Sequence, residues 1–223
     1  MTNEVDIMAA ESIVFGKDFF VINPSRTALI IIDMQNAFVA EDGTYQSAEA
    51  RQMVPRLEKL IAFAREHRLP LIWTQSDHRP PYGGILLRKF PAIREDRVLW
   101  KGDPSFELYA DMPQPLDDEY RVVKHKYDAF FETDLDAILR NKGITTVIIT
   151  GTATNVCCES TARSAFFRDY NVVFPSDCNG TFDPEMQAAT LKTIDMFFGR
   201  VLPLEELLTE MAEVLPAARA GQA

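Results

Sequence analysis

Two adjacent cysteines, Cys157 and Cys158, follow a run of β-branched residues in the segment TVIITGTATNVCCESTARSA, residues 146–165. The run is typical of a strand covered on both faces, and Gly151 is expected to end it. Asn155 is expected to cap the next helix, which places the cysteines at the helix start. A thiol there has a lowered pKa and is a better nucleophile, and the backbone amides can hold an oxyanion. A buried structural cysteine is the competing interpretation, and this segment alone does not separate the two.

Two charged side chains follow other apolar strands of the chain. Asp33 comes directly after the run ALIII, and Lys124 comes after YRVV. The carboxyl ends of parallel strands meet at one edge of a sheet, so we expect these two residues to lie near the cysteines. A carboxylate there can take the proton of the thiol, and an ammonium group can stabilise both negative charges. Each residue alone also fits an ordinary role, as a loop aspartate or a solvated lysine.

The order of the expected elements predicts the fold. We expect strands at residues 28–32, 69–73, 120–123, 146–150, 171–174 and 199–202, and helices at residues 54–66, 135–140, 159–163, 185–198 and 204–214. Strands that alternate with helices form a mostly parallel sheet between two helical layers. The prediction is therefore a three-layer αβα, Rossmann-like α/β fold with about six strands. Residues 27–216 are expected to form one domain, between an N-terminal arm at residues 1–26 and a tail at residues 217–223.

Composition disfavours several classes of function. The formal net charge of −10 argues against a nucleic-acid partner. No apolar run is long enough to span a membrane, and the first residues do not resemble a secretory signal. Three cysteines, two of them adjacent, do not suit a disulfide framework and fit the reducing cytoplasm. The three histidines, His67, His78 and His125, form no metal-binding pattern with the cysteines, so we expect no metal and no other cofactor.

The segment at residues 76–116 is long, irregular and rich in proline, glycine and charge, and such segments are often functional. His78 opens it as a pocket candidate, whereas His125, next to Lys124 in a strand, should point the opposite way. The part at residues 76–103 is expected to help build the substrate pocket. Its cations are expected to bind a substrate carboxylate: Arg79, Arg88, Lys89, Arg94, Arg97 and Lys101. The alternative is a solvated loop, or one that packs against a neighbouring subunit.

Three stretches carry a family resemblance that covers about residues 25–214: ALIIIDMQNAF, VVKHKYDAFFETDLDAILRNKGI and VIITGTATNVCCESTARSAFFRDYNVVFPSDC. They resemble the isochorismatase-like cysteine hydrolase superfamily, which includes ureidoacrylate amidohydrolase, N-carbamoylsarcosine amidohydrolase, nicotinamidase and biuret hydrolase. The third stretch is the most specific. Within the superfamily the chain is most similar to the ureidoacrylate amidohydrolase branch.

The resemblance implies a triad of Asp33, Lys124 and Cys157, in which Cys157 rather than Cys158 is the nucleophile. It implies a cis peptide between Thr152 and Ala153, and an oxyanion hole formed by the backbone amides of Ala153 and Cys157. It also implies a homodimer or a homotetramer, and the phenylalanine pairs at residues 166–167 and 197–198 suit either an interface or the core. Substrate contacts are expected from Phe38, Gln75, His78, Arg79, Tyr127 and Asn155.

Several positions depart from the family pattern. In metal-dependent nicotinamidases the sequence at the end of the second strand is similar to Thr-Gln-Asp-Trp-His. This chain has TQSDH there, at residues 74–78. Ser76 thus replaces a ligand aspartate and no histidine follows before His125, which argues against a metal site. Lys126 replaces an arginine that is common in relatives, and Asp128 replaces a small residue. The resemblance therefore does not establish that this chain acts on the substrate of the ureidoacrylate branch. True isochorismatases lack the nucleophilic cysteine, so this chain is not expected to share their chemistry.

The sequence therefore predicts a cytoplasmic, cysteine-dependent amidohydrolase. Its thiolate would attack the carbonyl of a small ureido, carbamoyl or amide substrate, form a thioester, and release ammonia or an amine. The alternatives are an amidase for a neutral substrate such as biuret or nicotinamide, and a binding protein without catalysis. A redox sensor that uses the adjacent cysteines is disfavoured, because such a disulfide is strained.

Overall fold

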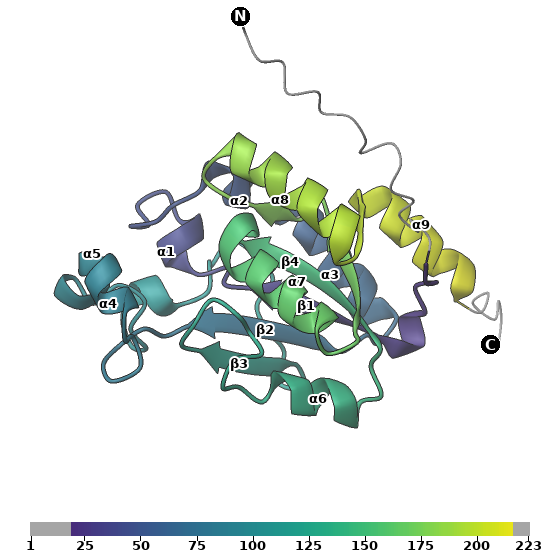
Figure 1. Cartoon of the computed structure of the whole chain (residues 1–223), viewed down its shortest axis with the longest axis horizontal. Helices are drawn as coiled ribbons and strands as arrows, with labels where there is room; N and C mark the ends of the chain where they lie inside the picture. Colours follow the sequence, from purple (N-terminus) through teal and green to yellow (C-terminus); the bar gives the residue numbers. More distant parts are fainter. Residues whose placement is uncertain (1–18, 216–223) are drawn as a thin grey trace, which may run out of the picture.

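The computed structural model describes residues 19–215, and a seven-stranded parallel sheet lies at its centre (Figure 1). The strands lie in the order β3-β2-β1-β4-β5-β7, and the short β6 pairs with the end of β4. Their bounds are β1 Thr27–Ile32, β2 Leu71–Ser76, β3 Tyr120–Lys124, β4 Thr146–Thr152, β5 Asn171–Pro175, β6 Asn179–Gly180 and β7 Arg200–Leu202. The predicted α/β fold with a mostly parallel sheet is confirmed, and β6 is the strand that the sequence did not predict.

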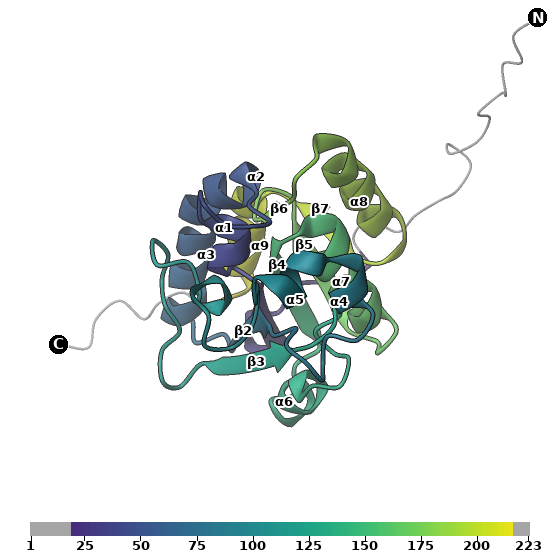
Figure 2. The same ribbon diagram turned by 90° about the vertical axis from the view of Figure 1, so that its left-hand side faces the viewer.

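Helices cover both faces of the sheet (Figure 2). On one face lie α2 (Ala48–Gln52), α3 (Val54–Glu66) and α9 (Leu204–Val214). On the other lie α6 (Leu135–Asn141), α7 (Glu159–Phe166) and α8 (Pro184–Phe197). Successive strand residues point to opposite faces, so Leu29 and Ile31 pack against the first layer while Ile30 and Ile32 pack against the second. Burial of these two aliphatic faces, at about 25 cal/mol per Å², holds the three layers together.

β1 and β4 are neighbours near the middle of the sheet, and the strand order continues in opposite directions from them. Ligands of such sheets bind at this switch point, beyond the carboxyl ends of the strands. Gly151 pairs with Ile32 here, at a φ of +119°, and a Cβ on it would lie 2.1 Å from the Ile32 carbonyl oxygen. Glycine therefore allows the close approach of the two strands. The prediction that Gly151 ends the strand is wrong, because β4 continues to Thr152.

The connection from β2 to β3 contains short helical elements, although the sequence predicted an irregular loop. They are α4 (Leu86–Lys89), α5 (Pro91–Glu95) and the 3₁₀ turn η3 (Pro104–Phe106). β2 also ends later than predicted, because Ser76 still pairs with Lys124 of β3. The end of β2 thereby comes into register with the end of β3.

The segment before β1 is described from residue 19 onward. Ile22 is fully buried in the core, and the 3₁₀ turn η2 (Pro24–Arg26) leads into β1, so the end of the predicted arm packs with the domain. The rest of that arm and the predicted tail lie outside the described residues, and the domain limits stay a prediction. The short α1 (Asn36–Val39) follows β1. Within residues 19–215 no helix has both the length and the apolar character needed to cross a membrane.

Candidate active site

Asp33 is the first residue after β1 and is fully buried. Its φ of +50° is a left-handed conformation, which aspartate adopts more often than most residues with a side chain. Its backbone amide donates to the carbonyl and the hydroxyl oxygens of Thr74, at 3.3 and 3.2 Å. These bonds fix the residue against the neighbouring strand β2.

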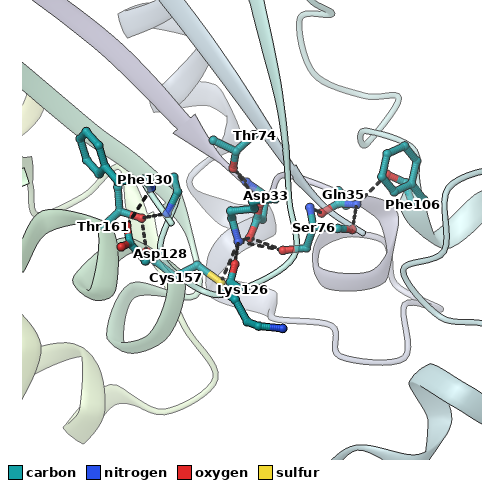
Figure 3. Close-up of polar contacts among 12 residues, drawn as sticks. Asp33, Gln35, Thr74, Ser76, Phe106, Lys126, Asp128, Phe130, Cys157 and Thr161 are labelled. Carbon is teal, nitrogen blue, oxygen red and sulfur yellow. Dashed lines mark hydrogen bonds and ion pairs between the residues drawn. The ribbon is translucent and has the colours of Figure 1, made fainter. Parts of the chain in front are cut away.

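Two hydroxyl groups of β2 hold the Asp33 carboxylate (Figure 3). Thr74 Oγ1 donates to Oδ1 at 2.7 Å, and Ser76 Oγ donates to Oδ2 at 2.9 Å. The two hydroxyls share one side of β2 because residues two apart in a strand point the same way. Gln35 fixes the end of this strand, since its amide oxygen accepts from the Ser76 backbone amide at 2.8 Å. Each carboxylate oxygen therefore has its own donor, which sets the orientation of the group.

Lys124, the last residue of β3, forms a fully buried ion pair with Asp33. Its Nζ lies 2.6 Å from Asp33 Oδ2, and it donates to Ser76 Oγ at 2.8 Å and to the Lys126 carbonyl at 3.1 Å. Burial lowers the pKa of Lys124, but its interactions with Asp33 and Cys157 outweigh burial and raise the pKa above its ordinary value. The side chain is therefore an ammonium group at neutral pH.

Cys157 lies in a π-helical turn, η4 (Thr154–Cys158), that joins β4 to α7. Such turns are rare and are frequent at functional sites. The Lys124 Nζ lies 3.5 Å from the Cys157 sulfur, so the structure brings the three predicted residues together from the ends of three strands. Cys158 is fully buried and packs in the apolar core.

Two expectations for this segment are wrong. Asn155 caps no helix, because it lies inside η4 and its Oδ1 accepts from the Thr181 hydroxyl. The pKa of the Cys157 thiol is not lowered either. Burial raises it to about 12, Lys124 opposes the rise, and Asp33 adds to it. The thiol therefore carries its proton in the resting site.

A cavity of about 140 Å³ opens beside the triad, and Cys157, Ala153 and Ser76 form part of its wall. The rest of the wall is mainly apolar. Its aromatic side chains are Phe38, Tyr45, Phe90, Tyr127 and Phe182. The peptide between Thr152 and Ala153 is cis, as the family resemblance implies.

Three of the six predicted substrate contacts line this cavity: Phe38, His78 and Tyr127. The His78 ring is buried, and burial together with the charge of Lys124 lowers its pKa to about 4. The imidazole is therefore neutral at pH 7. These three residues remain proposed contacts.

The other three predicted contacts have partners elsewhere in the protein. Gln75 Nε2 donates to the Phe106 carbonyl at 2.9 Å, and Arg79 forms an ion pair with Asp77 at 3.0 Å. None of Gln75, Arg79 and Asn155 is part of the cavity wall. Gln75 and its neighbour Ser76 point to opposite sides of β2, which explains why only the serine reaches the site.

The segment at residues 76–103 builds part of the cavity, but with apolar side chains. Leu86, Ile93 and Leu99 contribute to the wall, and none of the six cations in the segment does. Lys89 lies over the Phe90 ring instead, and Arg97 lies over the Trp100 ring. The expectation that these cations bind a substrate carboxylate gains no support from this cavity, because α4 and α5 bury apolar residues and leave their charges outside the wall.

The remaining histidines lie away from the triad. His125 follows the end of β3, where its ring stacks on Tyr82 and interacts with the Asp77 carbonyl. His67 follows α3 and packs against Phe63. Among the residues that the structure describes, no three His, Cys, Asp or Glu side chains are grouped as a metal site would need.

An acid, an ammonium group and a thiol at the carboxyl ends of a parallel sheet define the class of cysteine hydrolases. The isochorismatase domain family matches residues 27–206. The ureidoacrylate amidohydrolase RutB of Yersinia enterocolitica is 34% identical over 219 residues, which cover 89% of this chain and 93% of the relative. This chain belongs to the isochorismatase family.

Solved structures agree with that assignment. A cysteine hydrolase from Pseudomonas syringae pv. phaseolicola superposes with a TM-score of 0.83 at 31% identity, over 88% of this chain and 97% of the other. An N-carbamoylsarcosine amidase from Thermoplasma acidophilum gives a TM-score of 0.68 at 27% identity, over 81% and 97%.

Proposed function

We propose that the protein is a cysteine amidohydrolase that cleaves a C–N bond of a small amide or ureido compound, with Asp33, Lys124 and Cys157 as catalytic residues. One observation carries the proposal: a buried ammonium group contacts both a carboxylate, at 2.6 Å, and the sulfur of a cysteine in a cavity wall, at 3.5 Å. The names of the relatives point to the same bond type.

The first half of the reaction forms a thioester. Asp33 takes the proton from the Cys157 sulfur as the sulfur attacks the substrate carbonyl carbon, because the resting thiol is protonated. Lys124 stabilises the negative charge that develops between the two residues. The amides of Ala153 and Cys157 hold the oxyanion. The C–N bond then breaks, and the leaving nitrogen receives the proton from Asp33, so that ammonia or an amine departs.

The second half releases the acyl or carbamoyl group. A water molecule gives one proton to Asp33 and attacks the thioester carbon. The C–S bond breaks, and the sulfur recovers the proton from Asp33. The carboxylate is thereby restored for the next cycle, and no external oxidant or reductant is needed.

An ammonia-release assay over amides, ureas and N-carbamoyl compounds tests the proposal, together with an electrophile that labels cysteine. A protein that labels at Cys157 and hydrolyses at least one compound supports it. A protein that binds such compounds and releases no ammonia from any of them would instead be a binding protein on this fold.

We expect no dependence on a metal ion. The family resemblance places a ligand aspartate of metal-dependent relatives at position 76, where this chain has Ser76, whose hydroxyl contacts Asp33 and Lys124. Prolonged dialysis against EDTA should leave kcat and KM unchanged. If activity disappears and returns with stoichiometric zinc, manganese or iron, the expectation of a metal-independent reaction is wrong.

The proposal includes a homo-oligomer, either a dimer or a tetramer. Phe167 at the end of α7 and Phe197 at the end of α8 are 71% and 54% exposed and are not core residues, whereas Phe198 packs against the core. Phe166 and Phe198 extend the cluster through edge-to-face ring contacts. Exposed apolar patches of this kind often mark interfaces. Light scattering at micromolar concentration should give a mass above that of one 25.2 kDa chain, and a monomer mass would contradict the proposal.

The cytoplasmic location is part of the same proposal. Its support is chemical: Cys157, Cys158 and Cys178 are all free, and the nucleophile must stay reduced to work.

A further inference from the structure

The cavity wall facing Cys157 is made of rings and aliphatic side chains. Phe38, Tyr45 and Phe90 pack together, with ring centroids 6.3 Å apart for the first pair and 6.0 Å for the second. Leu86, Ile93 and Leu99 complete this part of the wall, and all three are almost fully buried. An apolar cavity of roughly 150 Å³ is the size that holds a benzene ring.

No free cation belongs to this wall within the described part of the chain. The Lys124 ammonium is already paired with Asp33. The Lys126 ammonium donates to the Tyr82 carbonyl at 2.8 Å and keeps its charge, but Lys126 is not part of the wall. Arg79, the first cation of the following segment, is paired with Asp77. A substrate carboxylate in the cavity would lose its water and meet no unpaired cation in the wall, which is unfavourable.

Two polar groups of the wall have no partner among the described residues. They are Nδ1 of His78 and the hydroxyl of Tyr45, and both are buried. His78 is neutral at pH 7, because burial and the charge of Lys124 lower its pKa to about 4. Buried polar atoms rarely stay without a hydrogen bond, so these two atoms fit uncharged polar groups of a ligand.

We propose that the substrate is an uncharged amide or urea with an apolar, ring-sized group close to the carbonyl carbon that Cys157 attacks. The inference rests on the proposed amidohydrolase function and narrows it, because it excludes small ureido acids as the preferred substrates. The apolar group lies between Phe38, Phe90 and Ile93, and the uncharged N–H and C=O groups meet His78 and Tyr45.

Matched pairs of substrates test the inference in the full-length protein. Benzamide is compared with 4-carbamoylbenzoate, and benzylurea with N-carbamoylphenylglycine, so that the members of each pair differ by one carboxylate. Ammonia release should give a kcat/KM at least about 100-fold higher for the neutral member. Equal or faster hydrolysis of the acidic member overturns the inference and leaves the amidohydrolase function standing. Release of ammonia from no compound of a wider amide and urea panel overturns both.

One variant should change this preference. Phe182 lines the cavity and is 51% exposed, so Phe182→Arg places a cation at the cavity mouth without disturbing the core. We expect the ratio of acidic to neutral kcat/KM to rise about tenfold, because the guanidinium now pairs with the carboxylate. Phe131→Arg is the matched control, since Phe131 is 46% exposed and lies outside the cavity wall. If both variants change the ratio equally, or neither changes it, the wall does not select against charge.

Discussion

Replacing Cys157 with alanine is expected to reduce kcat by about 10⁴-fold or more, to the limit of detection. The variant loses the sulfur atom that lies 3.5 Å from the Lys124 ammonium and forms part of the cavity wall. Ammonia release under single-turnover and steady-state conditions measures the effect. The fold should be kept, because the substitution removes one atom from a residue of which 5% is exposed.

Cys158→Ala is the matched control, at the next residue and with the same atom removed. Cys158 is fully buried in the core and is absent from the cavity wall, so this variant should keep most of the activity. Iodoacetamide followed by peptide mass spectrometry should label the protein at Cys157. A Cys157→Ala protein that still turns over substrate, paired with an inactive Cys158→Ala protein, would reverse the assignment.

Replacing Asp33 with asparagine is expected to cost about 3–5 kcal/mol of stability at neutral pH, because it leaves a buried ammonium group without its counter-charge. Both side chains of the pair are 0% exposed. Turnover should fall about 10²–10⁴-fold in addition, because the base is lost. Urea unfolding monitored by circular dichroism measures the first effect, and ammonia release the second.

The dependence of stability on pH identifies the cause of the stability loss in Asp33→Asn. In the wild-type protein the pKa of Lys124 is raised, so the charged side chain stabilises the fold. This stabilisation is fully present below the pKa of lysine in the unfolded chain, about 10.4, and is lost as pH rises through the pKa of Lys124 in the folded protein. In Asp33→Asn only burial and weaker partners remain, and burial lowers the pKa. At Lys124 the unfolded chain then binds more protons than the folded variant, so the stability lost in Asp33→Asn relative to the wild type should become smaller as pH rises from about 7 to about 10.

A double variant separates a lost ion pair from a general disturbance. Asp33→Asn with Lys124→Met removes both charges, and it should cost less than the sum of the two single variants. If the stability losses of the two single variants simply add in the double variant, the two charges do not form an ion pair. The same conclusion holds if the stability of Asp33→Asn depends on pH as that of the wild type does.

Sequence periodicity was a sound guide to the elements that pack on the sheet. The apolar spacing at residues 54–66 and 204–214 coincides with the bounds of α3 and α9, because each helix buries one stripe of side chains. The missed elements are short. α1, α2, α4 and α5 have too few turns to show a period, and they form because neighbouring parts of the chain bury them.

Asp33 and Lys124 could be found because each directly follows an apolar run, whereas the choice of Cys157 over Cys158 came from the family resemblance. Thr74 and Ser76 were not predicted as hydrogen-bond partners of Asp33, although their spacing in the sequence indicated it. They stand two apart in TQS, on one side of the strand that separates Asp33 from Lys124. The polarity of the cavity could not be predicted, because the 76–103 segment mixes cations with apolar residues without a period, and only the fold shows that Leu86, Ile93 and Leu99 line the cavity.

The order of strands in the sheet also divides the site between the two halves of the chain. β1, β2 and β3 are adjacent, so the Asp33–Lys124 pair and both supporting hydroxyls come from residues that a ribosome has already made by position 124. β4 then docks on the free edge of β1 and delivers Cys157 as the last component. The nucleophile is therefore unassisted until the second half of the chain has folded onto the first, and this makes the connection between β3 and β4 the natural boundary at which split fragments would regain activity only together.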